Sequence, residues 1–296
     1  MRLLVLGSGG MLGRAVVRDA TRLGHDVVAR ARTDLDITDP DRVSHTVAEI
    51  APRAIVNCAG FTDVDGAEGH EPEATRVNGD GPGNVARAAA EAGSRVVHVS
   101  TDYVFDGSKG DPWLESDSVA PLQAYGRTKL AGERAVLNTL PDRGYVVRTA
   151  WLYGTGGANF VRTMIRLEGQ REKLDVVDDQ RGQPTWSADL AGLLLALGRG
   201  ALAGTAPPGV YHGTSSGETT WYGLTREIFR LLGADPDRVH PTTSEAFVRP
   251  APRPAYSVLG HDRFAAAGVA PLRDWRAALA EAFPRIRRVH EEGDPA

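Results

Sequence analysis

The chain begins with the stretch that decides its fold, Arg2-Leu3-Leu4-Val5-Leu6-Gly7-Ser8-Gly9-Gly10-Met11-Leu12-Gly13. Its first five residues are apolar after the arginine, which predicts a strand buried on both faces, as in a parallel sheet. The next seven fit the spacing Gly-x-x-Gly-x-x-Gly, and apolar residues at helical spacing follow them. Glycines allow the backbone of such a turn to approach a pyrophosphate, which the free N–H groups of the helix N-terminus then bind. The order of strand, glycine-rich turn and helix therefore predicts a dinucleotide-binding unit.

The alternation of strands and helices continues to about residue 150. Apolar patterns predict further strands at 26–29, 54–58, 95–100 and 145–149, and helices at 11–23, 40–50, 83–92 and 124–137. Asp39 is the expected N-cap of the helix at 40–50, since Pro40 suits its first turn. This alternation predicts an α/β fold with a Rossmann-type, doubly wound parallel sheet. We expect residues 1–150 to form the dinucleotide-binding domain and residues 151–296 to form mainly a smaller C-terminal substrate-binding lobe, with some segments returning to the sheet.

The composition is ordinary for a soluble globular protein. Hydrophobic residues make up 42% of the 296 residues and charged residues 24%, which excludes collagen-like, disordered and disulfide-scaffold chains. The formal net charge of −4 gives no support for a nucleic-acid-binding surface. Cys58 is the only cysteine, so an internal disulfide and a multi-cysteine metal site are excluded. No run approaches the ~18 apolar residues that span a membrane, and the N-terminus has no signal-peptide pattern. We therefore expect a cytoplasmic protein without a membrane partner.

The residues after the second expected strand indicate which dinucleotide is bound. An acidic residue commonly stands in this region and binds the ribose hydroxyls, but here Arg30 and Arg32 occupy it. A guanidinium group suits the 2′-phosphate of NADPH through bidentate hydrogen bonds. The sequence thus favours NADPH over NADH, although acceptance of NADH stays open. The alternative is a pair of solvated surface arginines.

A tyrosine and a lysine stand four residues apart on the helix expected at 124–137. This spacing places Tyr125 and Lys129 on one face. A neighbouring ammonium group lowers the pKa of a phenol, so the pair is suited to giving a proton to a carbonyl that accepts hydride. Thr101 follows the strand at 95–100, beyond the carboxyl end of the sheet, where it can hydrogen-bond the same oxygen. A tyrosine and a lysine four residues apart are common by chance. The pair indicates a catalytic site only because Thr101 is expected beside it.

Together these motifs resemble the extended short-chain dehydrogenase/reductases, and longer blocks resemble one family among them, the dTDP-4-dehydrorhamnose reductases. The blocks keep their order along the chain at 57–68, 100–107, 125–133, 148–154, 159–160, 179–185, 211–212, 220–222 and 253–254. The run Ser-Thr-Asp-Tyr-Val-Phe-Asp-Gly at 100–107 is highly specific. The resemblance implies NADPH-dependent reduction of the C4 keto group of dTDP-4-dehydro-β-L-rhamnose to dTDP-L-rhamnose, a step of nucleotide-sugar biosynthesis.

The resemblance also implies roles for individual residues. Tyr125 would protonate the oxyanion at sugar C4, Lys129 would tune Tyr125 and hold the nicotinamide ribose, and Thr101 would orient the carbonyl. The cofactor would lie along Gly7, Gly10, Met11, Leu12, Gly13, Arg30, Arg32, Asp36, Ile37, Gly60, Phe61, Thr62, Val99, Tyr125 and Lys129. The dTDP-ketosugar substrate would contact Thr101, Asp102, Tyr103, Trp151, Gln180, Arg181 and Arg253. Among these, Trp151 would line the sugar pocket, and the glutamine and the two arginines would reach the nucleotide or its diphosphate.

Other functions stay open. A different dTDP-4-ketosugar reductase, such as dTDP-dihydrostreptose synthase, would share these motifs, and the abundance of Ala, Arg and Gly fits a high-GC bacterial source. The regulatory subunit of methionine adenosyltransferase uses the same fold without catalysis, and an epimerase would keep its cofactor bound.

No metal site is expected, because no two of the eight histidines have the i, i+4 spacing of a zinc site. Magnesium at a subunit contact and a homodimer both stay open.

Overall fold

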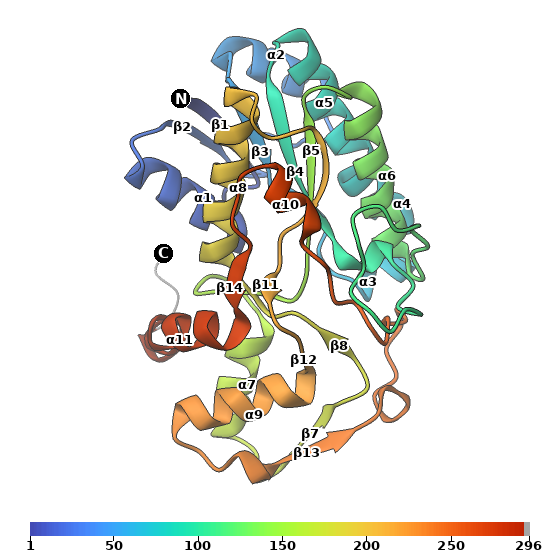
Figure 1. The fold of residues 1–296 in the computed structure, drawn as a ribbon, viewed down its shortest axis with the longest axis vertical. Coiled ribbons are helices and arrows are strands. Elements are labelled where there is room, and N and C mark those ends of the chain that lie inside the picture. The colour runs from blue at the N-terminus through green and yellow to red at the C-terminus, as the bar shows by residue number, and fades with distance from the viewer. Residues whose placement is uncertain (293–296) are drawn as a thin grey trace.

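The structure, a computed structural model, describes residues 1–292 and contains a six-stranded parallel sheet (Figure 1). Its strands are β1 (Arg2–Leu6), β2 (Asp26–Arg30), β3 (Ala54–Asn57), β4 (Arg95–Thr101), β5 (Gly144–Thr149) and β10 (Gly209–His212). Their order is β10-β5-β4-β3-β1-β2, and every neighbouring pair is parallel. The chain runs outward from β1 to β2 in one direction and from β3 to β10 in the other, so the strand order reverses between β1 and β3. The predicted Rossmann-type α/β fold is confirmed.

The two faces of the sheet bury different residues because side chains alternate along a strand. Leu3 and Val5 of β1 pack with α1 (Met11–Arg22) and α8 (Ser187–Ala203). Leu4 and Leu6 pack on the other face with α2 (Pro40–Ile50), α5 (Gly81–Glu91) and α6 (Ala124–Thr139). Each of these four side chains is at most 1% exposed, and burying a side chain of this kind contributes about 1.5–3 kcal/mol. The opening strand therefore joins both halves of the core.

The helix ends follow local rules where the sequence pattern is clear. Asp39 accepts a hydrogen bond from the Arg42 amide as the N-cap of α2, as predicted.

Residues 66–80, for which no helix is predicted, are nevertheless helical. They form α3 (Gly66–Gly69), α4 (Glu71–Thr75) and the π-helical turn η1 (Arg76–Asp80), which leads directly into α5. Glycines and a proline interrupt this stretch and hide its helical pattern.

The later part of the chain builds a smaller core, at the bottom of Figure 1. In it α7 (Phe160–Glu168), α9 (Trp221–Leu232) and α11 (Trp275–Glu292) enclose buried residues such as Trp275 and Ile228. Two-stranded sheets pair β6 (Leu152–Tyr153) with β9 (Thr185–Trp186), β7 (Leu174–Val177) with β13 (Val239–Thr242), β8 (Arg181–Gly182) with β12 (Thr219–Thr220), and β11 (Ser215–Ser216) with β14 (Leu272–Asp274). The remaining short elements are η2 (Asp102–Val104), η3 (Pro236–Arg238), η4 (Ser244–Ala246) and α10 (Asp262–Ala266).

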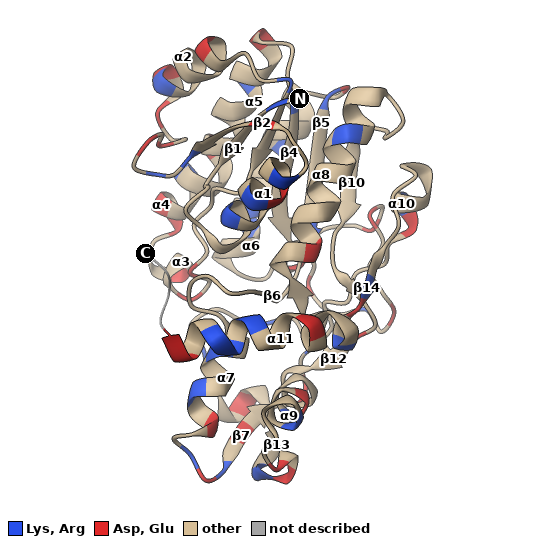
Figure 2. Ribbon diagram, turned by 90° about the vertical axis from the view of Figure 1, so that its left-hand side faces the viewer, with Lys and Arg blue, Asp and Glu red and all other residues tan. Residues whose placement is uncertain are grey.

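The chain crosses between the two cores more than once. Both α8 and β10 follow residue 150 in sequence, yet they pack with the large sheet. The division into residues 1–150 and 151–296 stays a prediction, and residues 293–296 lie outside the described part of the chain. In Figure 2 the ribbon of α11 carries both basic and acidic residues along its length. Within residues 1–292, no helix is long and apolar enough to cross a bilayer.

Candidate active site

The glycine-rich turn between β1 and α1 is folded tightly against the end of β3. Gly7 has a φ of 71°, and a Cβ there would lie 2.6 Å from the backbone nitrogen of Ala59. A Cβ on Gly13 would overlap the carbonyl oxygen of Gly7. Gly10 is the N-cap of α1, and its amide donates to the Gly7 carbonyl over 3.0 Å. Only glycine fits at positions 7 and 13, and the turn leaves the N-terminus of α1 open to a ligand.

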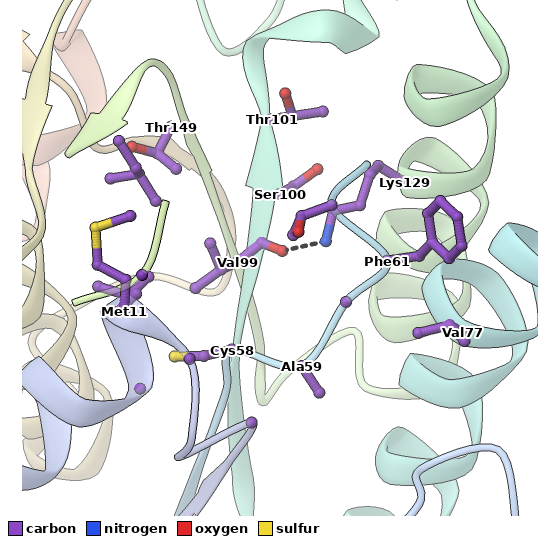
Figure 3. A pocket seen from close by; sticks show the side chains of 18 of the residues that line it. Met11, Cys58, Ala59, Phe61, Val77, Val99, Ser100, Thr101, Lys129 and Thr149 are labelled. Atoms are coloured by element: carbon purple, nitrogen blue, oxygen red, sulfur yellow. Dashed lines mark hydrogen bonds between the residues drawn. The ribbon is translucent and has the colours of Figure 1, made fainter. Parts of the chain in front are cut away.

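A cleft of about 820 Å³ opens at the carboxyl ends of the strands, next to this turn (Figure 3). Most of the predicted site residues line it together: Gly7, Gly10, Met11, Leu12, Gly13, Arg32, Asp36, Ile37, Gly60, Phe61, Thr62, Val99, Thr101, Asp102, Tyr103, Tyr125, Lys129 and Trp151. Ligands of open parallel sheets bind at this edge. The geometry therefore joins the glycine-rich turn and the Thr–Tyr–Lys group in one cavity.

Four predicted residues do not line the cleft. Arg30 ends β2, and its guanidinium donates to the carbonyl of Ala29. Arg181 forms an ion pair with Glu218 at 2.9 Å. The other two, Gln180 and Arg253, make polar contacts just outside the lining. The ligand-binding roles of these four residues stay predictions.

Lys129 is buried and its ammonium group is fixed by the backbone. Its Nζ donates to the carbonyl of Val99 over 2.6 Å, as Figure 3 shows. Burial lowers the pKa of Lys129 to about 8, although the carboxylate of Glu133 acts in the opposite direction. Glu133 itself is held by a buried ion pair with Arg148 at 2.7 Å and by the hydroxyl of Ser100 at 2.6 Å. Helix α6 and strands β4 and β5 thus position the lysine together.

Tyr125 differs from the sequence expectation in its electrostatics. Burial raises the pKa of Tyr125, the negative charge of Asp102 raises it further, and the Thr101 hydroxyl acts against both. The net shift of the Tyr125 pKa is therefore upward, and the expected lowering by Lys129 stays a prediction. The lysine is bonded to the Val99 carbonyl. A phenol with a raised pKa keeps its proton at neutral pH, which is the state that a proton donor needs.

Asp102 is a buried carboxylate beside this tyrosine. Its Oδ1 accepts a hydrogen bond from the Thr101 hydroxyl over 3.0 Å. The same hydroxyl oxygen accepts from the Tyr103 amide over 3.2 Å, so Thr101 is held from both sides. Burial raises the pKa of Asp102 to about 7, against the hydrogen bonds of Ser257 and Thr101. The group can therefore change its charge near neutral pH.

Two stacked tryptophans close the other end of the cleft. Trp151 lies two residues after the end of β5 and has a φ of 45°. Its ring stacks on Trp221 with the ring centroids 3.5 Å apart and the planes 10° apart. A Cβ on Gly182 would lie 2.7 Å from the Trp151 ring. The indole nitrogen of Trp221 donates to Gln180 over 3.1 Å. Gln180 thus orients an aromatic ring that lines the cleft.

Sequence reasoning gave Trp221 no role, although it lies in one of the family-like blocks. The signal in the sequence is Thr220 directly before Trp221, because threonine is a common N-cap and so marks the start of a helix. In the structure the Thr220 hydroxyl caps α9 by accepting a hydrogen bond from the Gly223 amide.

Cys58 also lines the cleft, and burial raises the pKa of its thiol to about 12, which makes it unreactive. Among residues 1–292, no three His, Cys, Asp or Glu side chains are grouped so that they could hold a metal ion.

Comparison with known proteins places the chain in a family. The family described as RmlD substrate binding domain matches residues 1–288. A dTDP-4-dehydrorhamnose reductase from Streptomyces griseus is 57% identical over 285 residues, which cover 96% of this chain and 94% of that protein. A solved dTDP-4-dehydrorhamnose reductase from Clostridium acetobutylicum has a TM-score of 0.91 at 40% identity and covers 97% of this chain and 100% of its own. Another from Bacillus anthracis, solved in complex with NADP, has a TM-score of 0.89 at 35% identity, with 96% and 98% covered. The chain therefore belongs to the RmlD substrate binding domain family.

Proposed function

We propose that this chain reduces the C4 keto group of dTDP-4-dehydro-β-L-rhamnose to dTDP-L-rhamnose with NADPH. The names of the three relatives support the reaction, and the NADP complex of one of them supports a nicotinamide cofactor. The observation that carries the proposal is the single cleft that joins the glycine-rich turn to Thr101, Tyr125 and Lys129. A non-catalytic role is not favoured, because this reactive group is complete and faces a cavity of ligand size.

The glycine-rich side of the cleft fits a dinucleotide. Gly7 and Gly13 leave no room for a Cβ, and the N-terminus of α1 offers amide groups to a pyrophosphate. The residues that would hold the cofactor are Gly7, Gly10, Met11, Leu12, Gly13, Arg32, Asp36, Ile37, Gly60, Phe61, Thr62, Val99, Tyr125 and Lys129. When bound, NADPH supplies the hydride for sugar C4.

Arg32 is the better candidate of the two arginines for the 2′-phosphate of NADPH. Its exposed side chain lines the cleft, whereas Arg30 bonds to its neighbouring carbonyl outside the lining. Asp36 also lines the cleft, and its own loop binds it through Thr38. The amide of Thr38 lowers the pKa of Asp36, with a smaller contribution from the charge of Arg32. A preference for NADPH over NADH follows from Arg32.

Each side chain around the sugar and the nicotinamide has a separate role in the proposed reaction. Tyr125 donates its proton to the oxygen at sugar C4, because its raised pKa keeps the phenol protonated at neutral pH. The Thr101 hydroxyl, which the Tyr103 amide holds in place, turns its single proton from Asp102 to the same oxygen when the substrate binds. Lys129, fixed on Val99, binds the nicotinamide ribose. Trp151 forms an apolar wall against the deoxysugar ring.

The test is identification of the product. The purified protein is incubated with NADPH and dTDP-4-dehydro-β-L-rhamnose, and the sugar product is identified by NMR. We expect dTDP-L-rhamnose and one NADP⁺ for each sugar reduced. The same assay with other dTDP-4-ketosugars separates this function from that of a related reductase, such as dTDP-dihydrostreptose synthase. Turnover of another ketosugar, but not of this one, would contradict the proposal.

A further inference from the structure

A segment of the lobe, residues 243–254, crosses from β13 to the sheet domain and is here called the bridging segment. It exposes two large apolar side chains, Phe247 at 50% and Val248 at 86%. Arg249 follows them, with 61% of its side chain exposed. Nothing in the function proposed above uses these residues. Phe247, Val248 and Arg249 are therefore residues of the segment whose role is still unassigned.

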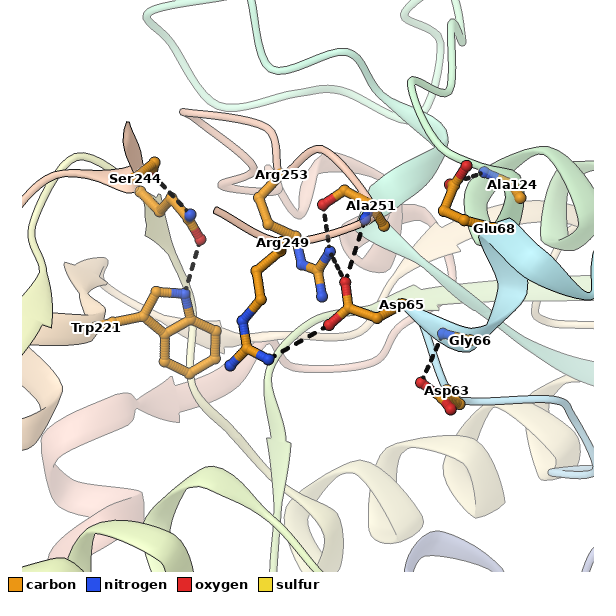
Figure 4. A network of polar contacts seen from close by, with 11 residues as sticks. Asp63, Asp65, Gly66, Glu68, Ala124, Trp221, Ser244, Arg249, Ala251 and Arg253 are labelled. Atoms are coloured by element: carbon orange, nitrogen blue, oxygen red, sulfur yellow. Dashed lines mark hydrogen bonds and ion pairs between the residues drawn. The ribbon is translucent and has the colours of Figure 1, made fainter. Parts of the chain in front are cut away.

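Both ends of the bridging segment are tied to residues that line or orient the cleft. Near its start, the Ser244 amide and hydroxyl donate to Asp179 over 2.8 and 2.6 Å. The Ser244 oxygen also accepts from Gln180, which accepts in turn from the cleft-lining Trp221 (Figure 4). Because of these contacts, the segment starts at the substrate end of the cleft, beside the tryptophan pair.

The far end of the bridging segment is bound to Asp65 in the sheet domain. The Ala251 amide and the Arg253 guanidinium both donate to its Oδ1, over 3.2 and 2.9 Å. Arg253 also lies over the ring of Tyr103, 6.0 Å from the centroid, and Tyr103 packs edge-on against Tyr125 at 6.2 Å. A single ring therefore separates this arginine from the proton donor, and Val64, the neighbour of Asp65, lines the cleft.

The arginines at this end differ in how firmly they are held. Arg253 is only 17% exposed and donates to both Asp65 and the Ala251 carbonyl. Arg181 is paired with Glu218 at 2.9 Å. Arg249 contacts Asp65 at 3.6 Å, which is longer than a good hydrogen bond, and its side chain is mostly in solvent. Such an exposed pair contributes little, so another anion can replace Asp65 as the partner of Arg249.

Resting on the function proposed above, we propose that Arg249 binds the diphosphate of the nucleotide-sugar substrate and uses Asp65 as its resting partner. C1 and C4 lie on opposite sides of a pyranose ring, so with sugar C4 at Tyr125 the diphosphate on C1 lies on the side of the sugar away from the proton donor. Figure 4 shows the Arg249 guanidinium reaching toward Asp65, with Trp221 on its other side. Asp65 remains satisfied when Arg249 leaves, because Arg253 and the Ala251 amide stay bonded to it.

The charge state of Asp65 is consistent with this exchange. Burial acts to raise the pKa of Asp65, but the hydrogen bonds of Arg253 and Ala251 and the nearby arginine charges outweigh it, so the pKa is lowered. Asp65 thus stays ionised and repels a diphosphate that approaches it directly. The arginine side chain can swing out while the backbone of the bridging segment stays anchored, so binding requires no large movement of the segment.

The test compares ligands that differ only in the phosphate. Binding of dTDP and of thymidine is measured by calorimetry for the wild-type chain, Arg249→Ala and Arg249→Lys. Arg287→Ala is the matched control, because it removes another exposed arginine, 50% exposed against 61% for Arg249, from an ion pair on α11, with Glu291 at 2.8 Å. We expect Arg249→Ala to weaken dTDP binding at least about tenfold, as for loss of a charge-assisted hydrogen bond. Thymidine binding should stay unchanged, and Arg249→Lys should restore part of the loss.

NADPH binding distinguishes the substrate diphosphate from that of the cofactor, and its Kd should be unchanged in Arg249→Ala. In turnover, the KM for the ketosugar should rise while kcat stays within about twofold. An equal loss for dTDP and thymidine, a loss for NADPH, or the same loss in Arg287→Ala would overturn the proposal. A wild-type chain that binds dTDP while Arg249→Ala binds it equally well would overturn it and leave the proposed function standing. A wild-type chain that binds no dTDP would overturn the proposed function as well.

Discussion

The two sides of the cleft are built in different ways. On the sheet side, the lining residues follow directly from strand ends: Gly7 after β1, Cys58 to Gly60 after β3, and Thr101 at the end of β4. On the lobe side, Trp151 and Trp221 come from distant parts of the chain and are joined by ring stacking and by the contacts of Gln180. The sheet side is therefore fixed by local backbone geometry, and the lobe side by long-range side-chain contacts. Changes on the two sides should accordingly affect different ligands.

The largest effect is expected for Tyr125→Phe, which tests the chemistry at the junction of the two sides. The change removes the proton donor and keeps the ring that packs against Tyr103. Turnover should fall by ~10²–10⁴, the usual contribution of a general acid. The Kd of NADPH and the Tm should stay close to those of the wild-type chain, and both are measured alongside steady-state kinetics. Near-normal turnover would remove Tyr125 from the mechanism.

Gly13→Ala tests how rigid the sheet side is. A Cβ here overlaps the Gly7 carbonyl, so we expect a loss of about 1–3 kcal/mol in the free energy of unfolding and at least tenfold weaker NADPH binding. Gly9→Ala is the matched control for stability, because the atom nearest to its new Cβ is the Ala31 Cβ at 3.5 Å, an ordinary contact, although Gly9 also lines the cleft. Denaturant unfolding and cofactor titration measure both quantities. An equal free energy of unfolding for the two variants would contradict the tight packing of Gly13 against Gly7.

Arg32→Ala sharpens the comparison within the sheet side. Loss of a charge-assisted hydrogen bond, about 1.5–3 kcal/mol, should reduce the preference for NADPH over NADH at least tenfold. Arg30→Ala should leave the preference nearly unchanged, because Arg30 does not line the cleft. The ratio of kcat/KM for the two cofactors is the measurement. A larger effect at Arg30 than at Arg32 would reverse the assignment.

Trp151→Ala tests the lobe side. The variant loses a stacked aromatic pair, which is worth about 0.5–1.5 kcal/mol beyond area burial. We expect a loss of kcat/KM for the ketosugar of roughly tenfold, with little change in NADPH binding, since an interaction energy of about 1.4 kcal/mol corresponds to tenfold. A fully buried tryptophan would instead cost ~3–5 kcal/mol of stability. A large drop in Tm with normal sugar reduction by the folded fraction would make Trp151 a structural residue.

The remaining effect concerns the pH dependence of stability and is measured without substrate. Burial raises the pKa of Asp102 to about 7 from an ordinary value of 3.8. Between these values the folded state holds a proton that the unfolded chain releases, so Asp102 lowers stability as the pH rises through about 4 to 7. Asp102→Asn removes this titration. The linkage amounts to about 1.4 kcal/mol per pH unit, so the Tm of this variant relative to the wild-type chain should increase by roughly 5–10 °C from pH 4.5 to pH 7.5. A constant difference would contradict the raised pKa.

The contrast between the two sides also explains what could be predicted from the sequence. The strand at 2–6, the cap at Asp39 and the Tyr125–Lys129 pair depend on residues within a few positions of one another, and local patterns identified them. Helices α3 and α4 were missed because glycines and Pro72 mask their periodicity. The ion pair between Asp65 and Arg253 joins residues 188 positions apart, and no local pattern reports such a contact.

The same reasoning accounts for the residues that sequence reasoning assigned differently or left out. Arg181 looks like a free phosphate ligand in sequence because its partner, Glu218, is 37 positions away, between β11 and β12. Gln180 orients Trp221 instead of lining the cleft. Arg249 lies between the family-like blocks, so only its position over Asp65 in the folded chain draws attention to it.

The most direct test of the proposed function follows the hydride itself. The wild-type chain is supplied with NADPH that carries deuterium at the transferable position of nicotinamide C4, together with dTDP-4-dehydro-β-L-rhamnose. We predict one deuterium at C4 of the product dTDP-L-rhamnose and one NADP⁺ released for each sugar reduced. Product without deuterium at C4, or sugar conversion without accumulation of NADP⁺, would contradict the assignment of this chain as a C4 ketosugar reductase.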